Sequence, residues 1–155
     1  DRPAGCAVDL APQLVLPRAW AEPVRALDLD QSEQLAWEQL REALAEAQGA
    51  EPAVTAMDPL VMHHLLGYPH ETSGSMPLTC ELLDRGEDVS DGFPETHPLA
   101  GELEEPARRW RLLLQLSVDD HLGWTAQEPD GRLYVWIDEG ALRDRDFTRV
   151  YALPR

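Results

Sequence analysis

Three histidines and a glutamate lie close enough in the sequence to raise the question of a metal site. His63 and His64 are adjacent, and His70 and Glu71 follow after a Gly-Tyr-Pro turn. Zinc is held by imidazole and carboxylate ligands in tight geometry. The step of six residues from His64 to His70 matches no standard zinc motif. We therefore interpret these histidines as turn residues and expect no bound metal and no cofactor.

A second set of chemically capable residues is the run Asp119, Asp120 and His121, at the end of an expected strand. Paired carboxylates beside a histidine can do acid–base work or bind a cation. Adjacent strand residues point to opposite faces, however, so the two aspartates are poorly placed to act together. An unrecognised hydrolase or metal-binding protein that uses these three residues is the alternative hypothesis.

Motifs that would carry other chemistry are absent from the sequence. Glycines form neither GxGxxG nor a P-loop, and no GxSxG serine motif occurs. Cys6 and Cys80 form no CxxC pair, so we expect reduced thiols in a cytoplasmic protein. Cys80 lies beside apolar residues without basic neighbours, which is typical of a buried, inert thiol. We expect no enzymatic activity.

The charge balance restricts the partners of this 155-residue chain, which has 29 acidic and 13 basic residues and a formal net charge of -16. Nucleic acids and anionic membranes both need a cationic surface, so we expect neither as a ligand. Long-range steering would instead favour a basic protein partner. The length predicts a single domain over residues 1–155.

Alternating apolar residues predict an antiparallel sheet as the centre of the fold. In Trp110 to Asp119, the residues Leu112, Leu114, Leu116 and Val118 share one apolar face. Further strands are expected at Leu122 to Gln127, Arg132 to Asp138 and Phe147 to Leu153. The turn Glu128-Pro129-Asp130-Gly131 would join the first two of these as a hairpin. The fold class is therefore α+β: an antiparallel sheet with one main amphipathic helix and long surface loops.

The main helix is expected from Gln31 to Gln48, packed on the sheet. Asp30 is a plausible N-cap, and Glu33 completes a capping-box pattern. Short strands are expected at Ala7 to Leu16, interrupted by Pro12, and at Leu78 to Leu83. The stretch from Asp84 to Arg108 is rich in Gly, Pro and carboxylates, which predicts a long surface loop.

Five segments resemble, in order and spacing, the C-terminal half of the YwqG-like family, bacterial proteins of unknown function. These segments are HHLLGYPHETSGSM (63–76), CELL (80–83), WRLLLQLSVDD (110–120), GWTAQEPDGRLYVWI (123–137) and DFTRVY (146–151). The resemblance implies a mixed α and β fold with an internal duplication, whose first half either lies upstream of Asp1 or is missing. It supplies no catalytic residues. The family is loosely associated with secreted-toxin loci.

The function that these patterns favour is a non-catalytic protein-binding module that neutralises a basic partner such as a toxin. Two groups of residues are candidates for the binding surface. Trp124, Tyr134 and Trp136 would form an aromatic surface unless a helix covers them, and we favour a core position because large aromatic side chains are mostly buried. Glu102, Glu104 and Glu105 would supply the negative charge.

Overall fold

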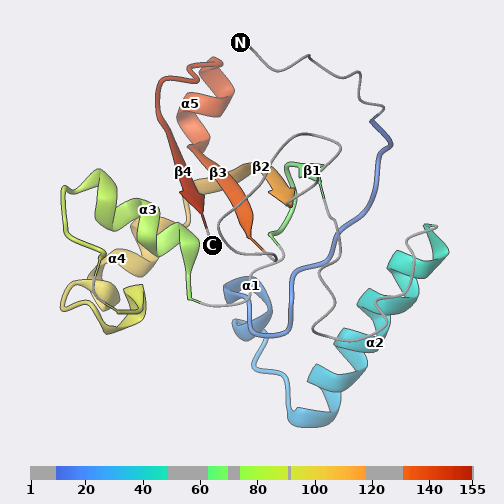
Figure 1. Cartoon of the computed structure of the whole chain (residues 1–155). Helices are drawn as coiled ribbons and strands as arrows, with labels where there is room; N and C mark the ends of the chain where they lie inside the picture. The colour runs from blue at the N-terminus through green and yellow to red at the C-terminus, as the bar shows by residue number, and fades with distance from the viewer. Residues whose placement is uncertain (1–9, 49–62, 70–73, 91, 118–130, 155) are drawn as a thin grey trace. The chain divides into compact units, whose positions relative to one another are not determined.

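The computed structural model describes residues 10–48, 63–69, 74–90, 92–117 and 131–154 of the chain (Figure 1). Over these residues it contains five α-helices, one 3-10 helix and four strands, which confirms the α+β class. The chain divides into two compact units, residues 1–61 with 118–125 and residues 62–117 with 126–155. The expectation of a single domain stays a prediction.

The first unit contains α1 (Glu22–Arg25) and α2 (Gln31–Ala47), so the main helix lies where the sequence predicts it. The capping box is confirmed, because the Asp30 side chain accepts from the backbone of Glu33 and the Glu33 side chain accepts from the backbone of Asp30. No strand forms over residues 10–16, where Pro12 removes a backbone donor.

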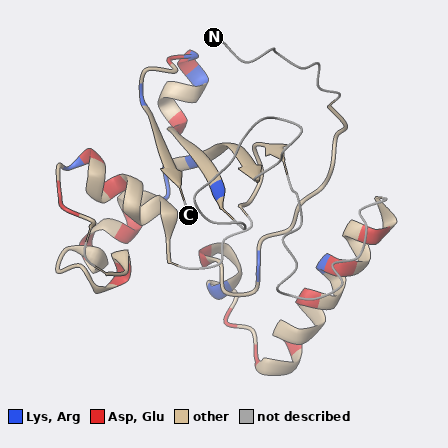
Figure 2. Ribbon diagram, in the orientation of Figure 1, with Lys and Arg blue, Asp and Glu red and all other residues tan. Residues whose placement is uncertain are grey.

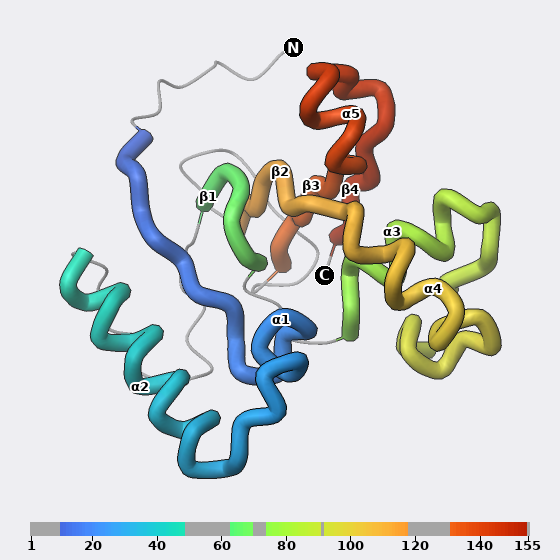
Figure 3. The backbone as a smooth tube through the Cα atoms, turned by 180° about the vertical axis from the view of Figure 1, so that it is seen from behind, coloured from blue at the N-terminus to red at the C-terminus, as the bar shows by residue number. Residues whose placement is uncertain are grey.

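The extended segment of residues 14–19 is instead held by hydrogen bonds to α2, and Figure 3 shows its path. The Trp37 indole donates to the Pro17 carbonyl at 2.8 Å, and the Arg41 guanidinium donates to the Leu16 carbonyl at 3.0 Å. No residue of α2 is buried. Within the second unit, α3 packs on the sheet.

The helix α3 (Met76–Asp84) replaces the strand expected at Leu78 to Leu83. Ser75 is its N-cap and accepts from the Leu78 backbone, while a proline lies in the first turn, where it costs no hydrogen bond. Leu78 and Leu82 are four residues apart and share one helical face, and both are buried. A short apolar run is compatible with either a strand or a helix. Here the Ser75 N-cap favours the helix.

The sheet of the second unit has the order β1-β2-β3-β4 and is antiparallel throughout. Its strands are β1 (His64–Leu65), β2 (Trp110–Ser117), β3 (Arg132–Asp138) and β4 (Val150–Pro154). The strand expected at 122–127 lies outside the described residues. The strand β3, the predicted hairpin partner of that segment, has both edges occupied: it pairs with β2 on one side and with β4 on the other.

A bulge in β2 changes which residues the sheet buries. Leu112 faces Trp136 and Leu114 faces Val135, so Leu113 is an extra residue. One extra residue reverses the alternation beyond it. Gln115 and Ser117 are consequently buried, whereas Leu114 and Leu116 are only half-buried. The single apolar face predicted through Leu112, Leu114 and Leu116 is therefore wrong after Leu112.

The main core forms between α3 and this sheet. It contains the buried residues Met76, Cys80, Trp110, Leu112, Tyr134, Trp136 and Leu153. Cys80 is fully buried, which confirms its predicted position. The helix α5 (Glu139–Asp144) follows β3 directly, with Asp138 as its N-cap.

The long loop expected from Asp84 to Arg108 contains two helices. The 3-10 helix η1 (Pro94–Thr96) and α4 (Ala100–Ala107) lie within it. Ala100, Leu103 and Ala107 recur at helical spacing and pack on Leu78 and Leu82 of α3. Burial of this stripe outweighs the helix-breaking tendency of Gly101 and Pro106. Over the described residues, no helix is long and apolar enough to cross a membrane.

Candidate functional site

The three glutamates predicted to supply negative charge lie on α4. Glu102, Glu104 and Glu105 are all exposed, because the buried stripe of α4 occupies the side that packs on α3. Tyr134 and Trp136 are 0% and 3% exposed, so their interpretation as core residues is confirmed and neither side chain offers a surface to a partner. Trp124, Asp119, Asp120 and His121 lie outside the described residues.

The exposed carboxylates around α4 and η1 form what we call the acidic surface, made up of Asp88, Glu95, Glu102, Glu104 and Glu105. Figure 2 shows acidic residues gathered over α3, α4 and the segment between them. Arg108 pairs with Glu105 at 2.6 Å. Glu102 and Glu104 form no ion pair within the described part of the chain. The negative charge of this surface is therefore only partly compensated.

Asp88 contributes a firmly ionised carboxylate to the acidic surface. Its side chain accepts a hydrogen bond from the Ser90 backbone at 2.9 Å. This bond, with a further contribution from the Ser90 side chain, lowers the pKa of Asp88 below its ordinary value. Hydrogen bonds to the charged form favour that form, so Asp88 is negative throughout the physiological range.

An exposed aromatic side chain, Phe93, lies in sequence among these carboxylates. It is 60% exposed, although the next residue, Pro94, is buried. Two sets of hydrogen bonds hold the turn that follows Phe93. The Glu95 side chain accepts from the Ser75 backbone, and the Thr96 hydroxyl and amide both donate to the Phe93 carbonyl. The backbone therefore holds Phe93 in a defined, outward position.

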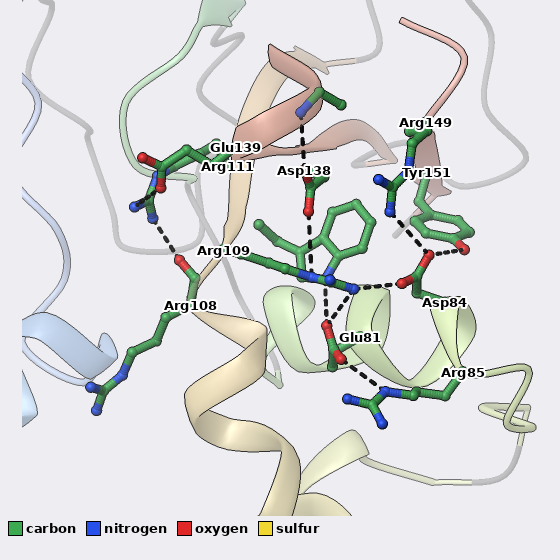
Figure 4. Close-up of polar contacts among 12 residues, drawn as sticks. Glu81, Asp84, Arg85, Arg108, Arg109, Arg111, Asp138, Glu139, Arg149 and Tyr151 are labelled. Atoms are coloured by element: carbon green, nitrogen blue, oxygen red, sulfur yellow. Dashed lines mark hydrogen bonds and ion pairs between the residues drawn. The ribbon is translucent and has the colours of Figure 1, made fainter. Parts of the chain in front are cut away.

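A second group of charged residues links α3 to the beginning of β2 and the end of β3 (Figure 4). Glu81 is fully buried and accepts from the Trp110 indole at 3.1 Å. Its carboxylate also pairs with Arg85 at 3.1 Å and with Arg109 at 3.0 Å. Arg109 bridges onward to Asp84 and Asp138.

The role of this Glu81–Arg109 group is structural. Each carboxylate already has a cationic partner or a backbone donor, since Asp138 also caps α5. Breaking such a buried pair is costly, which explains why the charges remain together. Sequence analysis did not predict this group, because a buried glutamate inside an apolar run is recognisable only once the run is known to be helical.

A third group of polar residues is buried at the other end of the same sheet face. Gln115 is 0%, Ser117 is 5% and Arg132 is 9% exposed. Ser117 and Arg132 are partners in the ladder, and His64 pairs with Gln115 from the other side. The Ser117 amide donates to the His63 imidazole at 3.3 Å. The bulge in β2 is what places these residues on the buried side.

The histidines considered as metal ligands are separated by their environments. His63 is exposed, and both ring nitrogens of His64 are buried without a hydrogen bond of good geometry. Burial lowers the pKa of His64, and the backbone of Tyr68 offsets that shift only in part. His70 and Glu71 lie outside the described residues. Among the residues described, no three metal-ligating side chains come together.

The described residues thus define an α+β protein whose four-stranded antiparallel sheet packs against α3 and whose α4 bears an acidic surface. A family model described as a domain of unknown function (DUF1963) matches residues 11–153. The chain belongs to this family. No curated protein and no solved structure matches this chain.

Proposed function

We propose that this chain is a non-catalytic protein-binding module whose acidic surface docks a basic protein. The observation that carries the proposal is the exposed Phe93, held within a stretch of exposed carboxylates, of which Glu102 and Glu104 form no ion pair within the described residues. The YwqG-like resemblance is consistent with this role, and a secreted toxin is one basic partner that it would suit.

Charge supplies the first argument. The formal net charge of -16 creates a negative field that accelerates the encounter with a cationic partner. Complementary charge also discriminates against acidic proteins, because juxtaposed like charges are unfavourable. Glu102 and Glu104, which have no ion-pair partner in the described chain, can each receive a lysine or arginine without first losing an internal contact.

Phe93 supplies the second argument, because charge alone gives little affinity. Aromatic anchors surrounded by polar residues are the usual energetic centres of interfaces. A phenylalanine face also attracts arginine and lysine, at about 0.5–2 kcal/mol for a cation–π contact. An exposed ring flanked by Glu95 therefore fits a basic partner better than a neutral one.

Preorganisation supplies the third argument. Leu103 of α4 packs on Leu78 and Leu82 of α3, and the turn before η1 is tied to Ser75. A surface that is already ordered loses less conformational entropy when it binds. The alternative, a hydrolase or metal-binding protein that uses Asp119, Asp120 and His121, is favoured by no described residue and stays a hypothesis.

The test is a binding measurement with the purified full chain and the purified products of neighbouring genes, with a cytochrome c as the basic protein of unrelated function. We expect one neighbouring product to bind, with an affinity that falls steeply as salt rises. Changing Glu102, Glu104 and Glu105 to Gln should weaken binding about ten-fold, in line with the modest contribution of each exposed charge. Phe93→Ala should weaken it by at least as much.

A matched control removes the same number of negative charges elsewhere. Glu42 and Glu46 on α2 and Asp144 on α5 are exposed, so Glu42→Gln, Glu46→Gln and Asp144→Asn together change the net charge equally. This control should keep its affinity within about two-fold, because only long-range steering is altered. Equal losses in both triple variants, or equal binding of cytochrome c, would refute a specific acidic surface.

A further inference from the structure

The imidazole of His97 makes one contact with the start of α4 and one with the segment that follows α3. Its Nδ1 accepts a hydrogen bond from the Leu99 backbone amide at 3.2 Å. Its Nε2 lies 3.8 Å from a carboxylate oxygen of Glu87. The side chain of His97 is 20% exposed, so both contacts are made in a partly desolvated position. One titratable ring therefore connects the two helices that form the second apolar cluster.

The backbone fixes the position of Glu87. It follows Gly86, whose φ of +76° ends α3 in the left-handed conformation that glycine allows. The Gly86 amide donates to the Leu83 carbonyl and the Glu87 amide donates to the Leu82 carbonyl, both at 3.0 Å. These two bonds are the Schellman arrangement of a helix C-terminus. Glu87 is thus held at a defined place at the end of α3.

The start of α4 depends on the His97 ring in a different way. Leu99 is the N-cap residue of α4 and has no side chain that could cap the helix. Its carbonyl accepts from the Leu103 amide at 3.1 Å, so Leu99 belongs to the first turn of the helix. Its own amide lies outside that ladder and needs another acceptor, as every backbone donor does. The Nδ1 atom of His97 is that acceptor.

The contact with Leu99 requires a neutral ring. In neutral imidazole one nitrogen donates and the other accepts, whereas both donate in the cation. Because Nδ1 accepts here, the proton belongs on Nε2, the atom that lies 3.8 Å from Glu87. Protonation of Nδ1 would set its N–H against the Leu99 N–H, and the new charge would oppose the dipole at the start of α4. The same charge would strengthen the attraction to Glu87.

Glu87 is the charged partner that the described part of the chain offers to His97. The other described charged residues of α3, η1, the segment between them and the first turn of α4 are Glu81, Asp84, Arg85, Asp88, Glu95 and Glu102. Glu81 and Asp84 pair with arginines, and Asp88 and Glu95 accept from backbone amides. No arginine among the described residues pairs with Glu87, so its carboxylate is available to a charged His97.

We propose that His97 is a pH-sensitive switch between α3 and α4. In the neutral form, the ring caps the start of α4 through Leu99. In the protonated form, the ring releases the Leu99 amide and pairs with Glu87. The first turn of α4 then loosens, and a positive charge is added at the start of the helix that bears Glu102. Binding of a basic partner to the acidic surface would weaken as pH falls, and this last step alone rests on the proposed function.

Nuclear magnetic resonance of the full chain, without any partner, tests the switch from about pH 7.5 to about pH 5, where imidazole ordinarily takes up its proton. The ring ¹⁵N shifts report which nitrogen of His97 carries a proton, and amide exchange reports whether the Leu99 N–H is held. At the upper pH we expect a proton on Nε2 alone and a protected Leu99 amide. At the lower pH we expect both nitrogens protonated and the Leu99 protection factor about ten-fold lower relative to that of Leu103, which reports wider opening.

Three variants separate the parts of the switch. His97→Gln keeps a neutral acceptor but cannot be protonated, so the pH response of Leu99 should disappear. Glu87→Gln keeps the cap and removes the partner of the charged ring, so release of Leu99 should need a lower pH. His64→Gln removes the buried histidine of β1 and should leave the response of Leu99 as it is in the parent chain.

The proposal is overturned if Leu99 stays protected while the His97 ring is doubly protonated, or if the ring takes up no second proton down to about pH 5. It is also overturned if the neutral ring carries its proton on Nδ1, or if His97→Gln retains the response. Failure of a basic partner to bind would contradict the proposed function and not the switch, because none of these measurements uses a partner.

Discussion

Arg109 lies with its guanidinium 3.0 Å from the Glu81 carboxylate, and thereby joins the start of the sheet to the fully buried centre of α3. The same carboxylate accepts from the Trp110 indole. The buried acid Glu81 therefore connects α3 to the start of β2, and Arg109 extends the connection to Asp138 at the end of β3. The position of α4, which leads directly into Arg109, depends on the same contact.

Removal of this acid should destabilise the protein strongly. Glu81→Ala leaves the Trp110 indole and the Arg109 guanidinium without their acceptor. We expect a loss of about 3 kcal/mol in the free energy of unfolding, at the lower end for broken buried pairs because Arg109 is partly exposed. Urea denaturation measures it. Glu104→Ala on the exposed side of α4 should leave the urea midpoint unchanged, and an equal loss there would contradict the assignment.

The bulge in β2 predicts unequal costs for two leucines that the sequence pattern makes equivalent. Leu112 is 2% exposed, whereas Leu116 is half-buried. Leu112→Ala should cost about 3 kcal/mol, as for a fully buried leucine. Leu116→Ala should cost less than half as much. Chemical denaturation of both variants measures the two losses in the free energy of unfolding. Equal losses would mean that the alternation continues without a bulge.

Two glycines near the acidic surface should respond to alanine in opposite directions. Gly74 has φ of +64°, and an added Cβ would lie 3.2 Å from Pro94. Gly74→Ala should destabilise the protein by about 1–2 kcal/mol, the cost of a left-handed conformation for a residue with a Cβ. Gly101 lies in α4 with open space around it, so Gly101→Ala should stabilise by about 0.5–1 kcal/mol. Thermal unfolding of both variants tests the sign.

His64 should make stability depend on pH. Burial lowers its pKa below the ordinary value of 6.5, so the unfolded chain binds a proton more readily than the folded one. The contribution of His64 is thus complete above pH 6.5 and is lost as pH falls through its folded pKa. Denaturation at pH 7.5 and 5.5 should show a smaller difference in His64→Gln than in the parent chain. An unchanged difference would mean that other groups account for it.

The first-unit helix shows how much a local pattern can predict. Asp30 and Glu33 are three residues apart, and both halves of their capping box form. These contacts lie within one helical turn, so they need no tertiary structure. The start of α2 was predictable for this reason, and the strands from Trp110 and Arg132 were predictable from the alternation of neighbouring residues.

The candidate sites were less accessible to sequence analysis. The exposed acids Glu102, Glu104 and Glu105 were predicted from composition, but their helix was not, because Gly101 and Pro106 suggest a loop.

The sequence by itself determined the α+β class, the acidic charge and the local caps, because each follows from composition or from residues within a few positions of one another. The tertiary structure decided that Leu78 to Leu83 is helical and that Gln115 and Ser117 are buried. It also decided that Glu81 and Arg109 meet across 28 positions of chain. These outcomes depend on the packing of α3, α4 and the sheet against one another, and on a bulge whose register is defined only by the neighbouring strands.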